Sequence, residues 1–186
     1  MKGTFQFVLI VEKETVFFRL RESAFCQPHQ CLLVTGKGYP CLSTRHFLDR
    51  VHTYFPHVPM YCLVDADVYG ADIFCRYKFG SRRQPREAAV ALTELQLLGL
   101  HLSHFDSLSA ASDDTKLIDF QACTIPLSEK SGRKLEKLLT SREAKADYVL
   151  KQFLLEIKTK GYLIFFVLYN PTLHDNLPFD SILFVI

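Results

Sequence analysis

Short apolar runs alternate with segments of helical spacing through the N-terminal part of the chain. A short run without a polar face is typical of a strand buried on both sides of a sheet, and apolar residues three and four apart are typical of a helix. The predicted strands are residues 8–11, 31–35 and 61–64, and the predicted helices are residues 15–21, 43–55 and 70–77. In the second helix, the residues expected to face the core are Phe47, Leu48, Val51 and Phe55. This alternation predicts an α/β fold, with a parallel sheet, right-handed crossovers and helices on its faces.

The C-terminal part of the chain has a different pattern. Residues 103–115 are rich in Ser, Asp and Ala and are expected to form a loop, and helical spacing returns at residues 134–139 and 147–160. We predict an α/β core at residues 1–102, a peripheral helical extension of the same domain at 103–160 and a divergent apolar tail at 161–186.

The apolar tail contains two runs that are suited to strands, at residues 162–169 and 181–186. The first run has eight residues, whereas a membrane-spanning helix needs about 20. We therefore expect no membrane partner.

Composition is that of a globular protein with one core. At 186 residues and 48% apolar content, the chain has the size of a single domain. Its 22 basic and 20 acidic residues give a net charge of +2, which by itself does not indicate a nucleic-acid partner. The six cysteines contain no Cys-x-x-Cys pair, and we interpret them as reduced thiols of a cytosolic or nuclear protein.

Acidic residues follow two of the predicted strands. Glu12 comes directly after the first strand, and Asp65 and Asp67 come directly after the third. Open α/β sheets place their ligands at the carboxyl ends of strands, and side chains two apart in an extended segment project to the same side. Carboxylates are the ligands that Mg²⁺ prefers, so the pattern predicts a metal site. The alternative from the residues alone is that these acids cap the helices that follow.

Four motifs in order along the chain resemble the Toprim domain of the meiotic double-strand-break transesterase and topoisomerase VI A-type subunit family. They are the glutamate segment at residues 10–17, the Gly-Lys-Gly turn with its flanks at 35–45, the Asp-x-Asp segment at 63–70 and the Tyr-Lys-Phe-Gly-Ser segment at 77–81. The resemblance is close over residues 5–102 and looser to about residue 157. It implies a Toprim-type, Rossmann-like parallel sheet flanked by helices.

The resemblance also implies roles for individual residues. Glu12, Asp65 and Asp67 would hold Mg²⁺ beside the scissile phosphate, where the metal neutralises charge. Lys37 and Arg45 would contact the DNA backbone, although both are equally expected as exposed residues of a loop and a helix start.

At the level of the cell, the resemblance implies a nuclear, chromosomal protein of meiotic DNA double-strand break formation and recombination. The partners implied are double-stranded DNA, a second copy or a full-length paralogue, and a topoisomerase VI B-type subunit. The family is a transesterase related to type IIB, ATP-hydrolysing DNA topoisomerases.

The sequence departs from the family pattern in two respects. The family's nucleophilic tyrosine lies on a winged-helix domain before the Toprim domain, in a Tyr-Tyr pair that this sequence lacks, so we predict no catalytic residue. Cys41 stands where the family often has an acid, and Val68 stands where it has a proline. The leading hypothesis is therefore a Toprim-only form that binds Mg²⁺ and DNA but does not cleave alone. The alternatives are a protein-interaction or regulatory isoform, and an independent Toprim nuclease that uses a metal-activated water.

Overall fold

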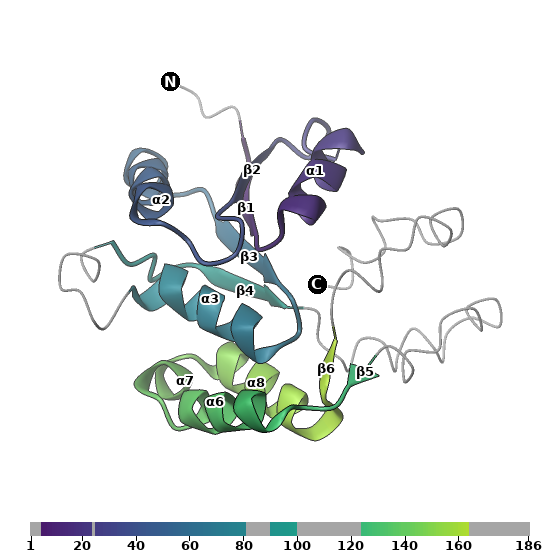
Figure 1. Ribbon diagram of the computed structural model, residues 1–186. Helices are drawn as coiled ribbons and strands as arrows, with labels where there is room; N and C mark the ends of the chain where they lie inside the picture. Colours follow the sequence, from purple (N-terminus) through teal and green to yellow (C-terminus); the bar gives the residue numbers. More distant parts are fainter. Residues whose placement is uncertain (1–4, 24, 81–89, 100–123, 164–186) are drawn as a thin grey trace. The chain divides into compact units, whose positions relative to one another are not determined.

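The computed structural model describes residues 5–23, 25–80, 90–99 and 124–163 (Figure 1). By their contacts, the residues divide into two compact units, one of Met1–Val64 with Tyr69–Leu98 and one of Asp65–Val68 with Gly99–Ile186. The predicted boundary at residues 102 and 103 and the tail from residue 164 lie outside the described residues.

The N-terminal unit is built on a four-stranded sheet. Its strands are β1 (Phe7–Val11), β2 (Cys31–Thr35), β3 (Met60–Val64) and β4 (Gln96–Gly99), in the spatial order β2-β1-β3-β4. β1 pairs in parallel with β2 on one side and with β3 on the other, which confirms the predicted α/β class. Val8, Leu9 and Ile10 have no exposed surface, because the central strand is covered on both faces.

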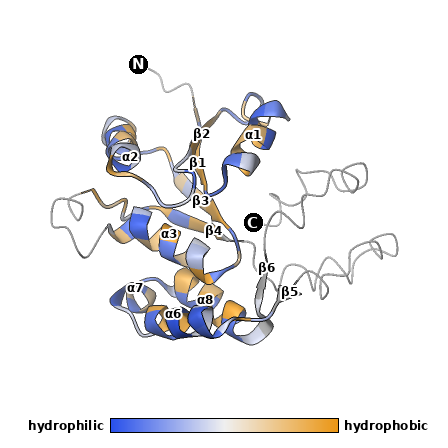
Figure 2. Ribbon diagram, viewed as in Figure 1, coloured by the Kyte–Doolittle hydropathy of each residue, from blue (hydrophilic) through white to orange (hydrophobic). Residues whose placement is uncertain are grey.

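Three helices connect these strands: α1 (Glu14–Glu22), α2 (Leu42–Tyr54) and α3 (Val68–Phe79). The direction of travel across the sheet reverses after β2, so right-handed crossovers place α1 and α2 on opposite faces. Figure 1 shows β1 and β2 between these two helices. Apolar colour is concentrated on the strands, whereas the helices mix apolar and polar residues (Figure 2).

The prediction that Phe47 of α2 faces the core was wrong, because this residue is 48% exposed. The helix instead buries Arg45, Leu48 and Val51. These three residues are spaced by three and share one side of a helix, whereas Phe47 is turned about 100° from Leu48.

The C-terminal unit contains three helices among its described residues, α6 (Glu129–Leu139), α7 (Arg142–Ala146) and α8 (Tyr148–Lys160). Its core includes Leu135, Leu150, Phe153 and Ile157. A short antiparallel pair, β5 (Thr124–Ile125) and β6 (Tyr162–Leu163), places a strand at the start of the predicted apolar run. Helices α6 and α8 lie where helical spacing was predicted, at residues 134–139 and 147–160, although α6 begins earlier than predicted and α7 was not foreseen.

Two further features concern expectations from the sequence. The five cysteines that the structure describes are all free thiols. Within the described ranges, no helix combines the length and the apolar character needed to cross a membrane.

Capping side chains fix the helix starts of the C-terminal unit. The Leu150 N–H donates to Asp147 Oδ1 at 3.0 Å, and the Ser131 N–H donates to Ser128 Oγ at 3.2 Å. These bonds satisfy N–H groups that have no partner within their own helices.

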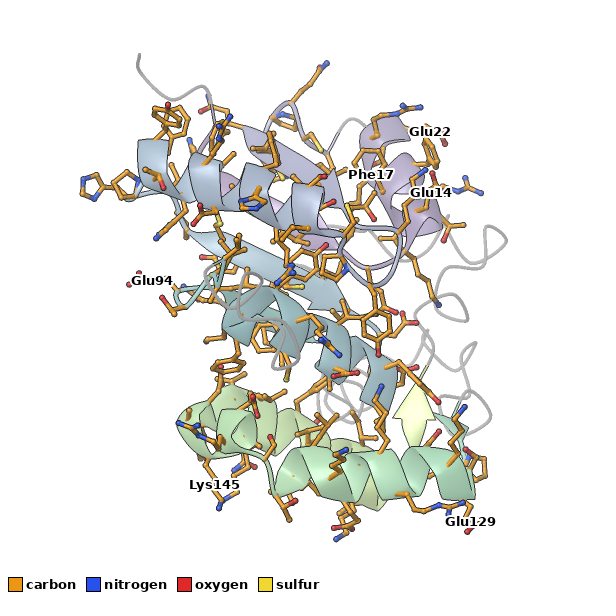
Figure 3. All side chains as sticks on the ribbon, turned by 60° about the vertical axis from the view of Figure 1, so that its left-hand side comes forward. Glu14, Phe17, Glu22, Glu94, Glu129 and Lys145 are labelled. Atoms are coloured by element: carbon orange, nitrogen blue, oxygen red, sulfur yellow. The ribbon has the colours of Figure 1, made fainter. Side chains whose placement is uncertain are left out.

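We predict that Asp147→Ala lowers the free energy of unfolding by about 0.5–2 kcal/mol, because α8 loses its cap. Urea unfolding of the full chain measures the change, with Lys145→Ala as the control, since Lys145 is exposed and lies close to Asp147 in the sequence (Figure 3). An equal loss in the two variants would contradict the capping role.

Candidate functional site

The site begins with the backbone at the carboxyl ends of β1, β2 and β3. In the register of the sheet, Val11 lies opposite Thr35 of β2 and Leu63 of β3. The Glu12 N–H donates to the Leu63 carbonyl at 3.0 Å, and the Gly38 N–H donates to the Glu12 carbonyl at 2.9 Å. The backbone of Glu12 is therefore fixed on both sides, between β3 and the turn that follows β2.

The three predicted metal ligands differ in burial. Asp65 is 5% exposed, and Glu12 and Asp67 are half-buried. Glu12 belongs to the N-terminal unit, and Asp65 and Asp67 belong to the C-terminal unit. Within the described residues, no three His, Cys, Asp or Glu side chains form a group able to hold a metal ion. The metal set therefore stays a prediction, supported by three hard oxygen donors placed just after strand ends.

The charge of Glu12 affects a thiol on the neighbouring strand β3. Burial raises the pKa of the Cys62 thiol, and the Glu12 carboxylate raises it further. Cys62 is therefore a neutral, buried core residue of β3.

Lys37 stands in a tight turn that side chains hold at several points. Lys37 and Gly38 have φ values of 56° and 98°, in the left-handed region. The Lys37 N–H donates to Thr35 Oγ1 at 3.1 Å, and the Tyr39 hydroxyl donates to Asp72 Oδ2 at 2.7 Å. The turn thus has a fixed backbone, while the Lys37 side chain is 67% exposed.

Lys37 is also paired with an acid that the sequence analysis did not single out. Its Nζ lies 2.6 Å from Oε1 of Glu14, the first residue of α1. The two residues are 23 positions apart, and only the pairing of β1 with β2 brings them together.

Arg45 has a different setting from Lys37. It lies in the first turns of α2 and is only 3% exposed, so of the two predicted DNA contacts, Lys37 alone presents its side chain to solvent. Burial raises the pKa of the Tyr77 phenol, and the positive charge of Arg45 partly opposes that rise. Arg45 is therefore part of the electrostatic environment of a buried tyrosine.

Tyr77 lies beneath the turn. Its side chain has no exposed surface, and its hydroxyl makes no hydrogen bond within the part of the chain that the structure describes. A Cβ atom added at Gly36 would lie 2.4 Å from that hydroxyl oxygen and 3.1 Å from Pro40 Cα. Gly36 is therefore required for space, whereas Gly38 is suited to its positive φ.

Cys41 occupies the N-cap of α2, and its thiol makes no capping hydrogen bond to the helix. Its Sγ lies 3.2 Å from Thr44 Oγ1. That side-chain contact, followed by nearby backbone groups, lowers the pKa of the Cys41 thiol.

A hollow of about 170 Å³ lies at the other end of β3. Its lining includes His52, His57, Met60, Glu94 and Gln96. Because Met60 begins β3 and Asp65 follows the strand's last residue, this hollow is not part of the candidate site.

Comparison with known proteins identifies the family. The model that describes the Toprim domain of the topoisomerase 6 A-subunit/Spo11 family matches residues 7–162. The chain belongs to this family. The match confirms the resemblance drawn from the four motifs and covers both the Lys37 turn and the strand-end acids.

Named relatives of this Toprim family member are meiotic recombination proteins. The chain is 42% identical over 135 residues to SPO11-1 of Oryza sativa subsp. indica, 34% over 155 residues to SPO11-1 of Arabidopsis thaliana and 38% over 136 residues to SPO11 of Homo sapiens. These matches cover 72%, 83% and 72% of this chain, but only 33%, 40% and 32% of the respective relatives. The chain thus spans 32–40% of their length.

Toprim domains generally bind divalent metal, so membership of the family supports a metal role for the strand-end acids. The sequence identified those acids and the turn. It did not identify the Glu14 partner of Lys37, the Tyr39–Asp72 hydrogen bond or the buried state of Arg45, because each depends on residues far apart in sequence.

We predict that Gly36→Ala destabilises the chain by about 1–3 kcal/mol, because the new methyl group overlaps the Tyr77 hydroxyl. Tyr77→Phe alone should be close to neutral, since it removes a hydroxyl that has no partner among the described residues. In a double-mutant cycle followed by urea unfolding, Tyr77→Phe should recover part of the loss caused by Gly36→Ala. Strict additivity of the two changes would refute the steric account.

We predict that Cys41→Asp stabilises α2 by about 0.5–1 kcal/mol at pH 7, because a carboxylate accepts from the N–H groups of the first turn. A capping carboxylate has a depressed pKa, so the gain should disappear as pH falls through that pKa. Thermal unfolding at pH 7 and at about pH 3 measures the effect, and Cys41→Asn separates hydrogen bonding from charge. A gain that is equal at both pH values in the Asp variant would contradict the charge contribution.

Proposed function

We propose that this chain is the Mg²⁺-dependent, DNA-binding Toprim part of a protein that acts in meiotic DNA double-strand break formation and recombination. The observation that carries the proposal is the strand-end arrangement within a confirmed Toprim family member. Carboxylates follow β1 and β3, and a turn with an exposed lysine is hydrogen-bonded to the Glu12 backbone.

In this proposal, Glu12, Asp65 and Asp67 hold the metal. A bound Mg²⁺ supplies positive charge beside a DNA phosphate, where it offsets the negative charge of the backbone. The chain's own residues position the DNA: Lys37 offers an ammonium group to a neighbouring phosphate, and phosphate contacts of this kind fix register without reading sequence. Arg45, the other predicted DNA contact, is buried in α2, so the proposal assigns the phosphate contact to Lys37 alone.

The wider setting follows from the relatives, whose names describe meiotic recombination proteins. We propose a nuclear, chromosomal location, pairing with a second copy or a full-length paralogue, and contact with a topoisomerase VI B-type subunit. The family's transesterase chemistry needs a tyrosine on a winged-helix domain, so we expect these residues to bind DNA without cleaving it alone.

The test is the affinity for a short DNA duplex with and without Mg²⁺, in the wild type and in Asp65→Asn/Asp67→Asn. Because an interaction with a charged group contributes about 1.5–3 kcal/mol, we expect Mg²⁺ to tighten wild-type binding roughly tenfold or more, and the double variant to lose that gain. The matched control is Glu94→Gln/Glu129→Gln, which removes two exposed carboxylates, both labelled in Figure 3, that do not directly follow β1 or β3 in the sequence.

The DNA products are checked for strand breaks in the same reactions. Binding that needs the two aspartates, without breaks, agrees with the proposal. Metal-dependent breaks by the purified chain would instead favour the independent nuclease, and an equal Mg²⁺ effect in all three proteins would remove the metal role from Asp65 and Asp67.

A further inference from the structure

The Glu14–Lys37 ion pair occupies the side chain that the proposed function assigns to DNA. The Nζ and Oε1 atoms are 2.6 Å apart, and the two side chains are 67% and 41% exposed, with Lys37 the more exposed. Glu14 begins α1 and belongs to the glutamate segment at residues 10–17, and Lys37 lies in the turn after β2. The pair therefore joins two of the family motifs directly.

A carboxylate at this distance holds the ammonium group in the way that a phosphate oxygen would. If a DNA phosphate approaches Nζ while Glu14 remains in place, two anionic groups share one cation and repel each other. The hydrogen bonds of Lys37 and Gly38 fix the backbone of the turn. When a phosphate approaches, the part that moves is therefore the flexible four-carbon side chain of the lysine. Lys37 must leave Glu14, at least in part, to contact DNA.

The Glu14–Lys37 ion pair is weak enough for a DNA phosphate to replace Glu14. Ion pairs between exposed side chains contribute little net free energy, because both groups are well solvated when apart. A DNA backbone with its closely spaced phosphates can therefore displace Glu14, whereas Lys37 remains neutralised in the absence of DNA.

We propose that Glu14 is an intramolecular competitor for Lys37, which lowers the affinity for DNA and its dependence on salt until a phosphate displaces it. This inference rests on the proposed DNA-binding function and adds a residue that determines its strength. Glu14 is a positioning residue here: it acts through Lys37 and does not touch the DNA.

The proposal is tested with Glu14→Gln in the full chain, by measuring the dissociation constant for a short duplex across a series of salt concentrations. Loss of an exposed ion pair corresponds to about a two- to fivefold tighter Kd at low salt. The slope of log Kobs against log[salt] should become steeper by up to about one. In the variant, the Lys37 contact releases a cation from the DNA, and no displaced Glu14 carboxylate takes up a cation in its place.

The matched control is Glu22→Gln, which removes the same charge from the other end of α1 (Figure 3). If Glu14→Gln and Glu22→Gln tighten binding equally, the effect is one of net charge and the proposal is wrong. In a Lys37→Met background, Glu14→Gln should have no more effect than Glu22→Gln, and a gain as large as in the wild type would also overturn the proposal.

A reversed pair, Glu14→Lys with Lys37→Glu, guards against loss of folding, since it retains an ion pair between α1 and the turn. It should unfold like the wild type but bind DNA more weakly, and wild-type affinity would contradict the role of Lys37. Tighter binding by Glu14→Gln when the wild type binds poorly supports the proposal. If no variant binds DNA, Glu14→Gln included, both the proposed function and this inference are rejected. If the wild type binds DNA and Glu14→Gln and Glu22→Gln change its affinity equally, only the inference is rejected.

Discussion

The parallel pairing of β1 with both β2 and β3 is the constraint on which the candidate site depends. Because β1 is central, its last residue lies opposite Thr35 and Leu63 at the same time. The acid that follows β1, the turn that follows β2 and the acid that follows β3 are therefore carried by ends of adjacent strands. A register shift of one residue would reverse the faces of the β1 side chains and remove Val8, Leu9 and Ile10 from their present packing.

Beneath the turn, the packing is tight and partly polar. Gly36 leaves space for the Tyr77 hydroxyl, and Arg45 lies close enough to alter the pKa of that phenol. Burying a polar group costs free energy unless the group is hydrogen-bonded or paired. The polar groups beneath the turn therefore distinguish this region from the apolar core of the sheet. Rigid packing below and fixed hydrogen bonds within the turn together hold the Lys37 backbone in its left-handed conformation.

Both negative and positive side chains lie at the strand ends, and their balance decides whether a polyanion such as DNA is attracted or repelled. Acids suited to a cation follow the strands, and the exposed Lys37 of the neighbouring turn is already neutralised by Glu14. Without a metal, such an arrangement repels phosphate, because the carboxylates are negative and the lysine is paired. In the proposed function, binding of metal and displacement of Glu14 would both change that balance in favour of DNA, so the affinity would depend on local charges and not on the net charge of +2.

The sequence alone determined the alternation of strands and helices, the acids after the first and third strands, and the family, because strand runs, helical spacing and short motifs are local properties. It located β2 at its observed bounds, but it gave the wrong core face for α2 at Phe47 and did not foresee α7. The tertiary structure decided that Arg45 is buried, that Tyr77 lies against Gly36 and that Lys37 is paired with Glu14. The burial of Arg45 and the other two contacts depend on residues that are distant in sequence, which come together only when the strands pair and the helices pack on the sheet.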